Sequence, residues 1–321
     1  MSKKLSLGVV AFAVAVIGAV GLVSNRQLIK DHYIVSTTQL SPASASLAQD
    51  IALTDSADFT YQASQPAVDD AAEFNAACKD VAHEQSIVLG CFTKQRIYIY
   101  NVTDPRLAGV KQVTAAHELL HAAYLRMSSS ERTEVDALLA QTAATIKDQR
   151  FKDTLEEYRQ SEPDQINNEL HSIIGTEIAV LPTALEKHYQ KYFKDRQKIV
   201  NYAKSYQDTF TELSDQIKSY DAQLLGLKNR KDTLENRLEG EQSSLQTESS
   251  RLQSLRSAGN TSAYNNAVPG YNELARRYND DVAELKQIIN SYNQIVDARN
   301  KLATTQNDLA QQLNSNYSPT Q

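Results

Sequence analysis

Residues 114–123 read Thr114-Ala115-Ala116-His117-Glu118-Leu119-Leu120-His121-Ala122-Ala123. Apart from the two histidines and the glutamate, every residue of this stretch is uncharged, which predicts a helix that can be buried beneath a cleft. Residues four positions apart lie one turn apart on the same helix face, so the imidazoles of His117 and His121 can reach one metal ion. The spacing therefore indicates a metal-binding helix, which we expect to run from about Leu107 to Arg126.

The residues around this helix predict a small mixed domain. Two β-type runs precede it at residues 86–92 and 96–102, and the short link between them indicates a β-hairpin. A further helix is expected upstream, from Ala67 to Ala82. Downstream, Ser128 and Glu131 have the spacing of a capping box, which predicts the start of the next helix.

Glu118 gives the segment its chemistry. It directly follows the first histidine and can reach a water bound to the metal. It can take a proton as that water attacks a carbonyl, and then pass the proton to the leaving amine. The alternative is an ordinary buried helix with two hydrogen-bonded histidines, but a buried glutamate between them is costly without a purpose.

The segment His117-Glu118-Leu119-Leu120-His121 resembles the HExxH motif of the zincin superfamily of metallopeptidases, with a similarity that covers roughly residues 85–180. The resemblance implies hydrolysis of peptide bonds with one Zn²⁺ per chain, His117 and His121 as ligands, and Glu118 as general base. A hairpin just before the helix also matches the zincin layout, in which an edge strand binds extended substrate. The metzincin pattern is not met, because Tyr124 and Met127 stand where it needs Gly and His.

A third metal ligand must come from further along the chain. Asn168-Glu169 resembles the gluzincin pattern, in which a Glu on a later helix, often preceded by Asn, completes the site. Ile173 stands where that helix often carries an acid, which leaves the partner of a ligand histidine unidentified. Glu177 is the alternative, because Gly175-Thr176-Glu177 is similar to an aspzincin segment, although its helix face is apolar. His171 is a third candidate.

An electrophile that stabilises the oxyanion is often a His or Tyr near the metal. His188, Tyr189 and Tyr192 follow on the next expected helix and are candidates for this role. The alternative for each is an ordinary packed or surface residue, because the chain contains 16 tyrosines.

The N-terminal residues predict a targeting segment. Lys3 and Lys4 precede an uncharged stretch whose apolar part runs from Leu7 to Val23, near the lower limit of a bilayer span. Residues 1–24 are therefore expected to form a single transmembrane helix that anchors the chain in the cell membrane, with its bulk extracytoplasmic. The alternative is a cleaved signal peptide and a secreted protein, since small residues such as Ala19 can support cleavage.

Residues 25–65 are rich in Ser, Thr, Ala, Gln and Asp, which predicts a flexible stalk between the membrane and the domain at 66–195. Cys78 and Cys91 are the two cysteines of the chain. In an exported protein, cysteines this close together are expected to form a disulfide. Two buried free thiols are the alternative.

Residues 196–315 have a different composition from the domain before them. Apolar residues recur at steps of four and three from Tyr206 to Leu255, and a second such pattern runs from Tyr271 to Leu313. Breaks at residues 257–260 and at Pro269-Gly270 separate them. The two patterns predict an antiparallel helical hairpin, with parallel dimerisation as the competing arrangement. Residues 316–321 are expected to be a disordered tail.

Composition limits the fold and the partners. A net charge of −6, from 33 basic and 39 acidic residues, argues against a nucleic-acid binder. Only 10 Gly and 7 Pro favour long helices, so the expected class is α+β, mainly α, with a zincin-like domain and a coiled-coil hairpin. The expected partners are a peptide or protein substrate, the membrane, and a protein bound by the hairpin, unless the hairpin is a spacer. The competing hypothesis is a non-enzymatic envelope protein whose metal site is structural or degenerate.

Overall fold

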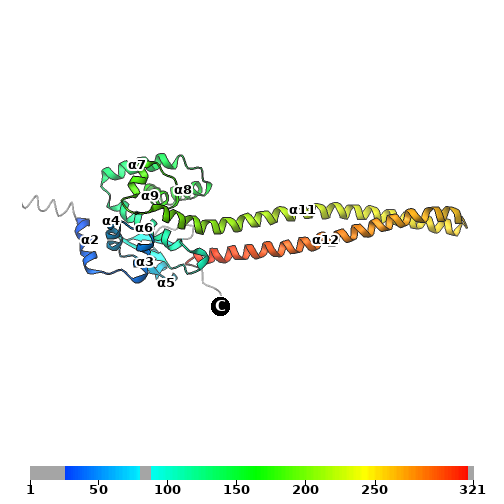
Figure 1. Ribbon diagram of the computed structural model, residues 1–321, viewed down its shortest axis with the longest axis horizontal. Coiled ribbons are helices and arrows are strands. Elements are labelled where there is room, and N and C mark those ends of the chain that lie inside the picture. The colour runs from blue at the N-terminus through cyan, green and yellow to red at the C-terminus, as the bar shows by residue number, and fades with distance from the viewer. Residues whose placement is uncertain (1–25, 80–87, 317–321) are drawn as a thin grey trace, which may run out of the picture. The chain divides into compact units, whose positions relative to one another are not determined.

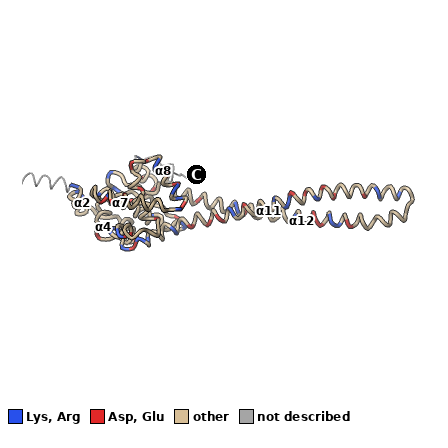
Figure 2. The backbone as a smooth tube through the Cα atoms, turned by 90° about the horizontal axis from the view of Figure 1, so that it is seen from above, with Lys and Arg blue, Asp and Glu red and all other residues tan. Residues whose placement is uncertain are grey.

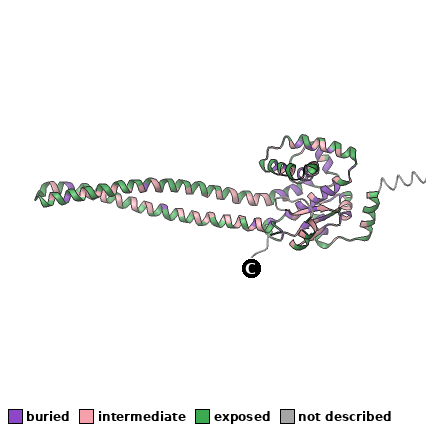
Figure 3. Ribbon diagram, turned by 180° about the vertical axis from the view of Figure 1, so that it is seen from behind, coloured by how far each residue is buried: buried purple, intermediate pink, exposed green. Residues whose placement is uncertain are grey.

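The computed structural model describes residues 26–79 and 88–316, and these fall into two compact units (Figure 1). The first unit contains the described residues of Met1–Thr209 and Leu309–Gln321, and the second is Phe210–Asp308. Buried residues concentrate in the first unit, whereas most of the second is exposed or half-buried (Figure 3). The core therefore lies in the first unit, which also holds every candidate metal ligand.

The described part of the first unit begins with three helices, α2 (Arg26–Thr37), α3 (Pro42–Asp50) and α4 (Asp55–Ala63). The flexible stalk expected at 25–65 is therefore wrong. Ser41 caps α3 and Thr54 caps α4, and their apolar faces bury Leu47, Ile51 and Tyr61 in the main core. Because each short helix supplies only a few apolar residues between many polar ones, the average composition concealed them.

A three-stranded sheet has the order β1-β3-β2. Strand β3 (Arg96–Tyr100) pairs in parallel with β1 (Ala67–Asp69) and antiparallel with β2 (Gly90–Thr93). Thr93 is paired with Arg96, and Lys94 and Gln95 between them have φ of 52° and 63°, the backbone of a tight hairpin turn. The predicted hairpin is confirmed, with Gly90–Thr93 and Arg96–Tyr100 as its strands.

The helix expected at Ala67–Ala82 is wrong at its start. Residues 67–69 form β1, and helix α5 (Ala71–Cys78) begins only after Asp70, whose carboxylate accepts hydrogen bonds from the first turn. Residues 67–69 form a strand because they pair with β3, and their local sequence pattern does not distinguish them from helix. Residues 80–82, and residues 86 and 87 of the first β-type run, lie outside the described part. A disulfide joins Cys78 at the end of α5 to Cys91 on β2, as predicted.

Helix α6 (Val110–Arg126) carries both motif histidines and lies between the sheet and α9 (Figure 1). It begins after Gly109, whose φ of 99° favours glycine, and Leu107 belongs instead to the 3-10 turn η1 (Pro105–Leu107). The predicted capping box of Ser128 and Glu131 is confirmed at the start of α7 (Ser129–Ala143). Four further elements complete this side: α8 (Gln149–Ser161), η2 (Pro163–Gln165), α9 (Ile166–Glu177) and α10 (Thr183–Tyr189).

Helices α11 (Arg196–Ser257) and α12 (Thr261–Leu313) are joined at Gly259. In the ion pairs between the two helices, the residue number rises along α11 as it falls along α12, which confirms the antiparallel hairpin. These pairs are Asp221–Arg299, Arg230–Glu284 and Arg237–Asp281. Figure 2 shows charges of both signs along the two arms. The second break expected at Pro269-Gly270 is wrong, because α12 continues through it. Both residues are exposed, so they do not interrupt the packing between α11 and α12.

The ends of the two arms belong to the first unit. Residues 196–209 of α11 pack there, and the guanidinium of Arg196 donates to the Glu186 carboxylate and to the carbonyls of Gly175 and Ile178. The domain border expected at residue 195 therefore coincides with a helix start, although the compact unit continues beyond it.

No helix within residues 26–79 and 88–316 is both long enough and apolar enough to cross a membrane. The expected anchor at 1–24 and the tail beyond residue 316 lie outside the described residues.

Candidate metal centre

Two helices bring the three candidate ligands together. Helix α6 presents His117 and His121 one turn apart, and their ring centroids are 4.7 Å apart. Helix α9 packs against α6 and presents Glu169 toward both rings. Its Oε2 lies 3.7 Å from Nε2 of His117, and its Oε1 lies 3.5 Å from Nε2 of His121. Of the third-ligand candidates, the structure thus brings Glu169 to the histidines.

The donor set fits a tetrahedral zinc ion. Ligand atoms bound about 2.0–2.2 Å from one tetrahedral ion lie roughly 3.4 Å apart. The two histidine–carboxylate separations are close to this value, and one ligand atom from each of the three residues lies within 4.8 Å of the others. Two imidazoles and one carboxylate leave a fourth position for water or substrate, as in catalytic zinc sites.

The surroundings of Glu169 favour its ionised form. Burial raises the pKa of this carboxyl, but His121, His117 and a hydrogen bond from the hydroxyl of Tyr158 outweigh burial and lower the pKa below its usual range. A carboxylate that stays ionised when it is 8% exposed is suited to a cation. Tyr158 was not identified from the sequence, since an isolated tyrosine on α8 carries no motif.

Ser172 supplies the partner that the sequence left unidentified for a ligand histidine. Its Oγ lies 3.2 Å from Nδ1 of His121, so a proton on Nδ1 leaves Nε2 free to bind a metal. Ser172 lies one turn after Glu169 on α9 and is fully buried. Sequence reasoning did not identify this role for Ser172, although its position one turn after Glu169 is a signal that could have found it.

Glu118 lies beside the ligands, beneath strand β2. It is 5% exposed, and it lines the same cleft as His117 and His121. Gly90 on β2 packs directly over it, because a Cβ at position 90 would lie 2.6 Å from Oε1 of Glu118 and 2.5 Å from Cγ2 of Thr114. The sheet therefore approaches the Glu118 carboxylate so closely that only glycine fits at position 90.

The cleft has a volume of about 790 Å³. One side is residues 88–92, which include the β2 edge of the sheet, and the floor is the ligand-bearing face of α6. Tyr158 and Glu162 line it from the α8–η2 side. This places a strand edge, three candidate ligands and a buried carboxylate around one open volume.

The other two third-ligand candidates are engaged elsewhere. Glu177 also lines the cleft, but its Oε2 accepts from Arg150 at 2.8 Å and from Gln207 at 3.0 Å. His171 is fully buried on the far face of α9, where its Nε2 lies 2.9 Å from Nε2 of His188. Neither belongs to the group of residues able to share an ion.

The three residues considered for oxyanion stabilisation surround His171 instead of the cleft. The rings of His188, Tyr189 and Tyr192 pack against it with centroids 5.1–6.0 Å away, and the Tyr189 hydroxyl donates to the His171 carbonyl. Burial lowers the pKa of His188 to about 4 and that of His171 well below its usual value. None of the three lines the cleft.

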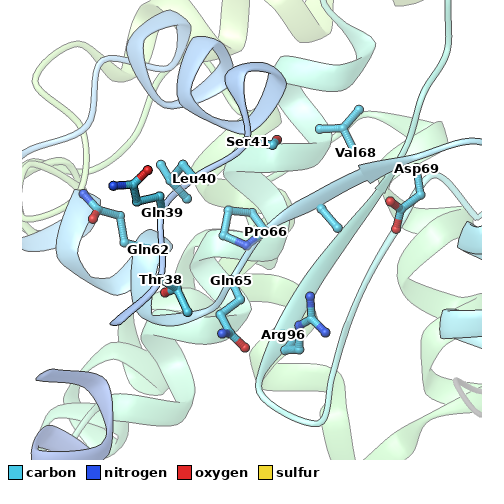
Figure 4. Close-up of a pocket in the computed structure, with 11 residues that line it drawn as sticks. Thr38, Gln39, Leu40, Ser41, Gln62, Gln65, Pro66, Val68, Asp69 and Arg96 are labelled. Atoms are coloured by element: carbon cyan, nitrogen blue, oxygen red, sulfur yellow. The ribbon is translucent and has the colours of Figure 1, made fainter. Parts of the chain in front are cut away.

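A second hollow of about 310 Å³ lies at the β1 edge of the sheet (Figure 4). It is bounded by the α2–α3 link, the end of α4 and β1, and its charged residues are Asp69 and Arg96. None of the candidate metal ligands lines it, so the chemistry described above is confined to the cleft at β2.

Compared with protein-family models, with curated proteins and with solved structures, the chain has no significant match.

Proposed function

We propose that this chain is a zinc-dependent metallopeptidase of zincin type. The observation that carries the proposal is the convergence of His117, His121 and Glu169 within 4.8 Å, with Glu118 buried beside them in one cleft. When bound, zinc would supply Lewis acidity that polarises a peptide carbonyl and makes water more acidic. Two of the three ligands come from one helix and the third from a helix packed on it.

Glu118 acts as the general base in this proposal. Its carboxylate holds the proton removed from the attacking water and delivers it to the departing amine nitrogen. Gly90 limits its position from above, and α6 fixes its position relative to His117.

Strand β2 offers a binding edge for an extended substrate. Among the described residues, β2 pairs only with β3, so its other edge is available, and residues 88–92 line the cleft. A peptide that adds to this edge makes main-chain hydrogen bonds that need no particular side chain. The disulfide from Cys91 to Cys78 attaches this strand to α5.

The proposed location is the outer side of a cell membrane. Disulfides persist in oxidising compartments, and Cys78 and Cys91 form one. The apolar residues 7–23 after two lysines supply the proposed single-pass anchor, with the enzyme extracytoplasmic. The proposed substrate is a peptide or protein in that compartment.

The test is zinc analysis of the full-length protein together with digestion of a peptide library. Glu118→Gln should keep zinc and lose peptide cleavage by about a hundredfold or more, because it removes only the base. Glu134→Gln, a matched change at an exposed position on α7, should keep both. Wild-type protein that binds no zinc and cleaves no peptide would favour the non-enzymatic alternative.

A further inference from the structure

The cleft is rich in carboxylates. Among its described lining residues, Arg132 is the one lysine or arginine. Five acidic residues line it: Glu118, Glu162, Asp164, Glu169 and Glu177. Even after a divalent cation and Arg132 are counted, the cleft keeps a net negative charge when these carboxyls are ionised. Because low-dielectric walls concentrate such a field, the cleft attracts positive groups.

Three of the five carboxylates already have partners. Glu169 is engaged by His117, His121 and Tyr158, Glu177 is held by Arg150, and Glu118 has a partner of its own. Arg132 is also engaged, since it donates to the carbonyl of Leu125 and lies over the ring of Tyr124. These groups leave little charge free to bind a substrate side chain.

Glu162 and Asp164 differ from the other three acids. Neither side chain has a hydrogen bond or an ion pair within the described part of the chain. Both lie at η2, directly before the helix that carries Glu169, and Glu162 is half-buried whereas Asp164 is exposed. Glu162 lines the same cleft as the candidate ligands, where burial and the negative charge of Glu169 raise its pKa and His121 lowers it.

A third acceptor on the same cleft follows these two carboxylates in the sequence. Asn168 lines the cleft, and its Oδ1 is buried without a hydrogen-bond donor, although its Nδ2 donates to Gln165. Residues 162–168 therefore supply the cleft lining with three acceptors that have no donor in the described part of the chain. A ligand group with several N–H donors and a positive charge matches them, and the side chains of Lys and Arg are such groups.

We propose that Glu162, with Asp164 and Asn168, selects substrates that carry a basic side chain close to the scissile bond. This rests on the proposed peptidase function and adds the substrate class to it. Glu162 forms the ion pair inside the cleft, while Asp164 attracts the same side chain at the exposed mouth. Because Glu162 is half-buried, its pair is stronger than a surface pair but weaker than a fully buried one.

The test uses the full-length protein and matched alanine-rich peptides that carry one Arg, Gln or Glu, placed at each position in turn. At its best position, Arg should be preferred over Gln by about tenfold in kcat/KM. Glu162→Gln should reduce this ratio to about twofold, and Glu162→Lys should favour Glu over Arg. The matched control Glu156→Gln, on the exposed face of α8, should leave the ratio unchanged.

Two measurements separate failure of this inference from failure of the proposed function. Zinc content and circular dichroism first verify that each variant is folded and metallated. Peptide binding to the Glu118→Gln protein then reports affinity without turnover. Equal affinity and equal cleavage for Arg and Gln peptides, or a Glu162→Gln protein with the full preference, would overturn the inference. Zinc-free protein that cleaves nothing would overturn the proposed function, and the binding ratio would still decide whether the cleft prefers basic peptides.

Discussion

Two histidine pairs lie within the same compact unit and differ in almost every respect but distance. His117 and His121 have ring centroids 4.7 Å apart, and His171 and His188 have centroids 5.1 Å apart. The first pair opens onto the cleft and shares a carboxylate, Glu169. The second is enclosed by tyrosine rings, and its two Nε2 atoms share one hydrogen bond. The first pair therefore has a nearby carboxylate and an opening to the cleft, as the proposed zinc site requires, whereas the second pair has neither.

The sharpest test of this difference is a matched substitution in each pair. His121→Gln should lower zinc affinity by more than about a hundredfold, because even outer-shell partners of a ligand contribute 10- to 100-fold. His188→Gln should leave zinc affinity unchanged, since its ring contacts His171 and not the ligands. Competitive titration with a metal-sensitive dye measures both. Loss of zinc in both variants would show that the enclosed pair is not independent of the site.

The enclosed pair should also dominate the loss of stability in mild acid. Burial lowers the pKa of His188 to about 4 and that of His171 further, whereas an unfolded histidine titrates near 6.5. Between these values the unfolded chain binds more protons, so stability is full above about pH 6.5 and falls as the pH drops toward 4. The loss attributable to His188 should be roughly 2–3 kcal/mol.

Urea denaturation of wild type and His188→Gln across this pH range measures the effect. The difference in free energy of unfolding between wild type and the variant should shrink as the pH falls, because only the wild type must keep His188 uncharged when it folds. The interval from pH 6.5 to 5 is the most informative, since most carboxyls are still ionised there. An advantage that stays constant with pH would contradict this assignment.

The motif, the pair of long helices and the disulfide were accessible from the sequence because each depends on local spacing. The positions of His117 and His121 require only the helical repeat. The antiparallel arms require only a heptad pattern and one turn. Glu169 was preferred over Glu177 through a resemblance, and the structure gives the physical reason for the difference, which is that Arg150 and Gln207 already hold Glu177.

The wrong predictions at residues 25–65 and 67–69 share a different cause, which is packing between segments far apart in the chain. Strand β1 exists because β3 pairs with it, and the helices at 26–63 are ordered because Ile51 and Tyr61 enter a core built from later residues. The buried Asp31 on α2 binds Arg126 at the end of α6. No local pattern in residues 25–65 reveals that partner. Gly90 and Ser172 were missed as functional residues for the same reason, since their roles depend on α6.

Two glycines allow the two histidine pairs to be compared again. Gly90 packs on the cleft side, against Glu118, and Gly175 packs near the enclosed pair, against Tyr189, so an alanine at either position adds one methyl group there. A Cβ at Gly90 would collide with Glu118 and Thr114, and a Cβ at Gly175 would lie 2.5 Å from Cδ1 of Leu120 and 2.6 Å from Cε1 of Tyr189. Both substitutions should cost about 1–3 kcal/mol of stability. Gly90→Ala should also lower kcat by about tenfold or more by displacing the base, whereas Gly175→Ala should lower stability with a smaller effect on kcat.

Thermal denaturation and peptide cleavage, measured on the same zinc-loaded samples, separate the two effects. If Gly175→Ala lowers kcat as much as Gly90→Ala, the packing around the enclosed pair is transmitted to the cleft. The two pairs would then be one cooperative unit, and the contrast between them would have to be abandoned.

The smallest expected effect concerns Ser172, which lies on α9 between the residues of the two pairs. Its hydroxyl faces Nδ1 of His121, and removing it leaves that ring free to rotate and to adopt the other tautomer. Ser172→Ala should therefore lower zinc affinity by about tenfold, and Ser172→Thr, which keeps the hydroxyl, should recover part of it. Thr176→Ala is the matched control, because its hydroxyl donates only to backbone carbonyls of its own helix. Equal zinc affinity for Ser172→Ala and wild type would mean that the packing of α6 against α9 alone orients His121.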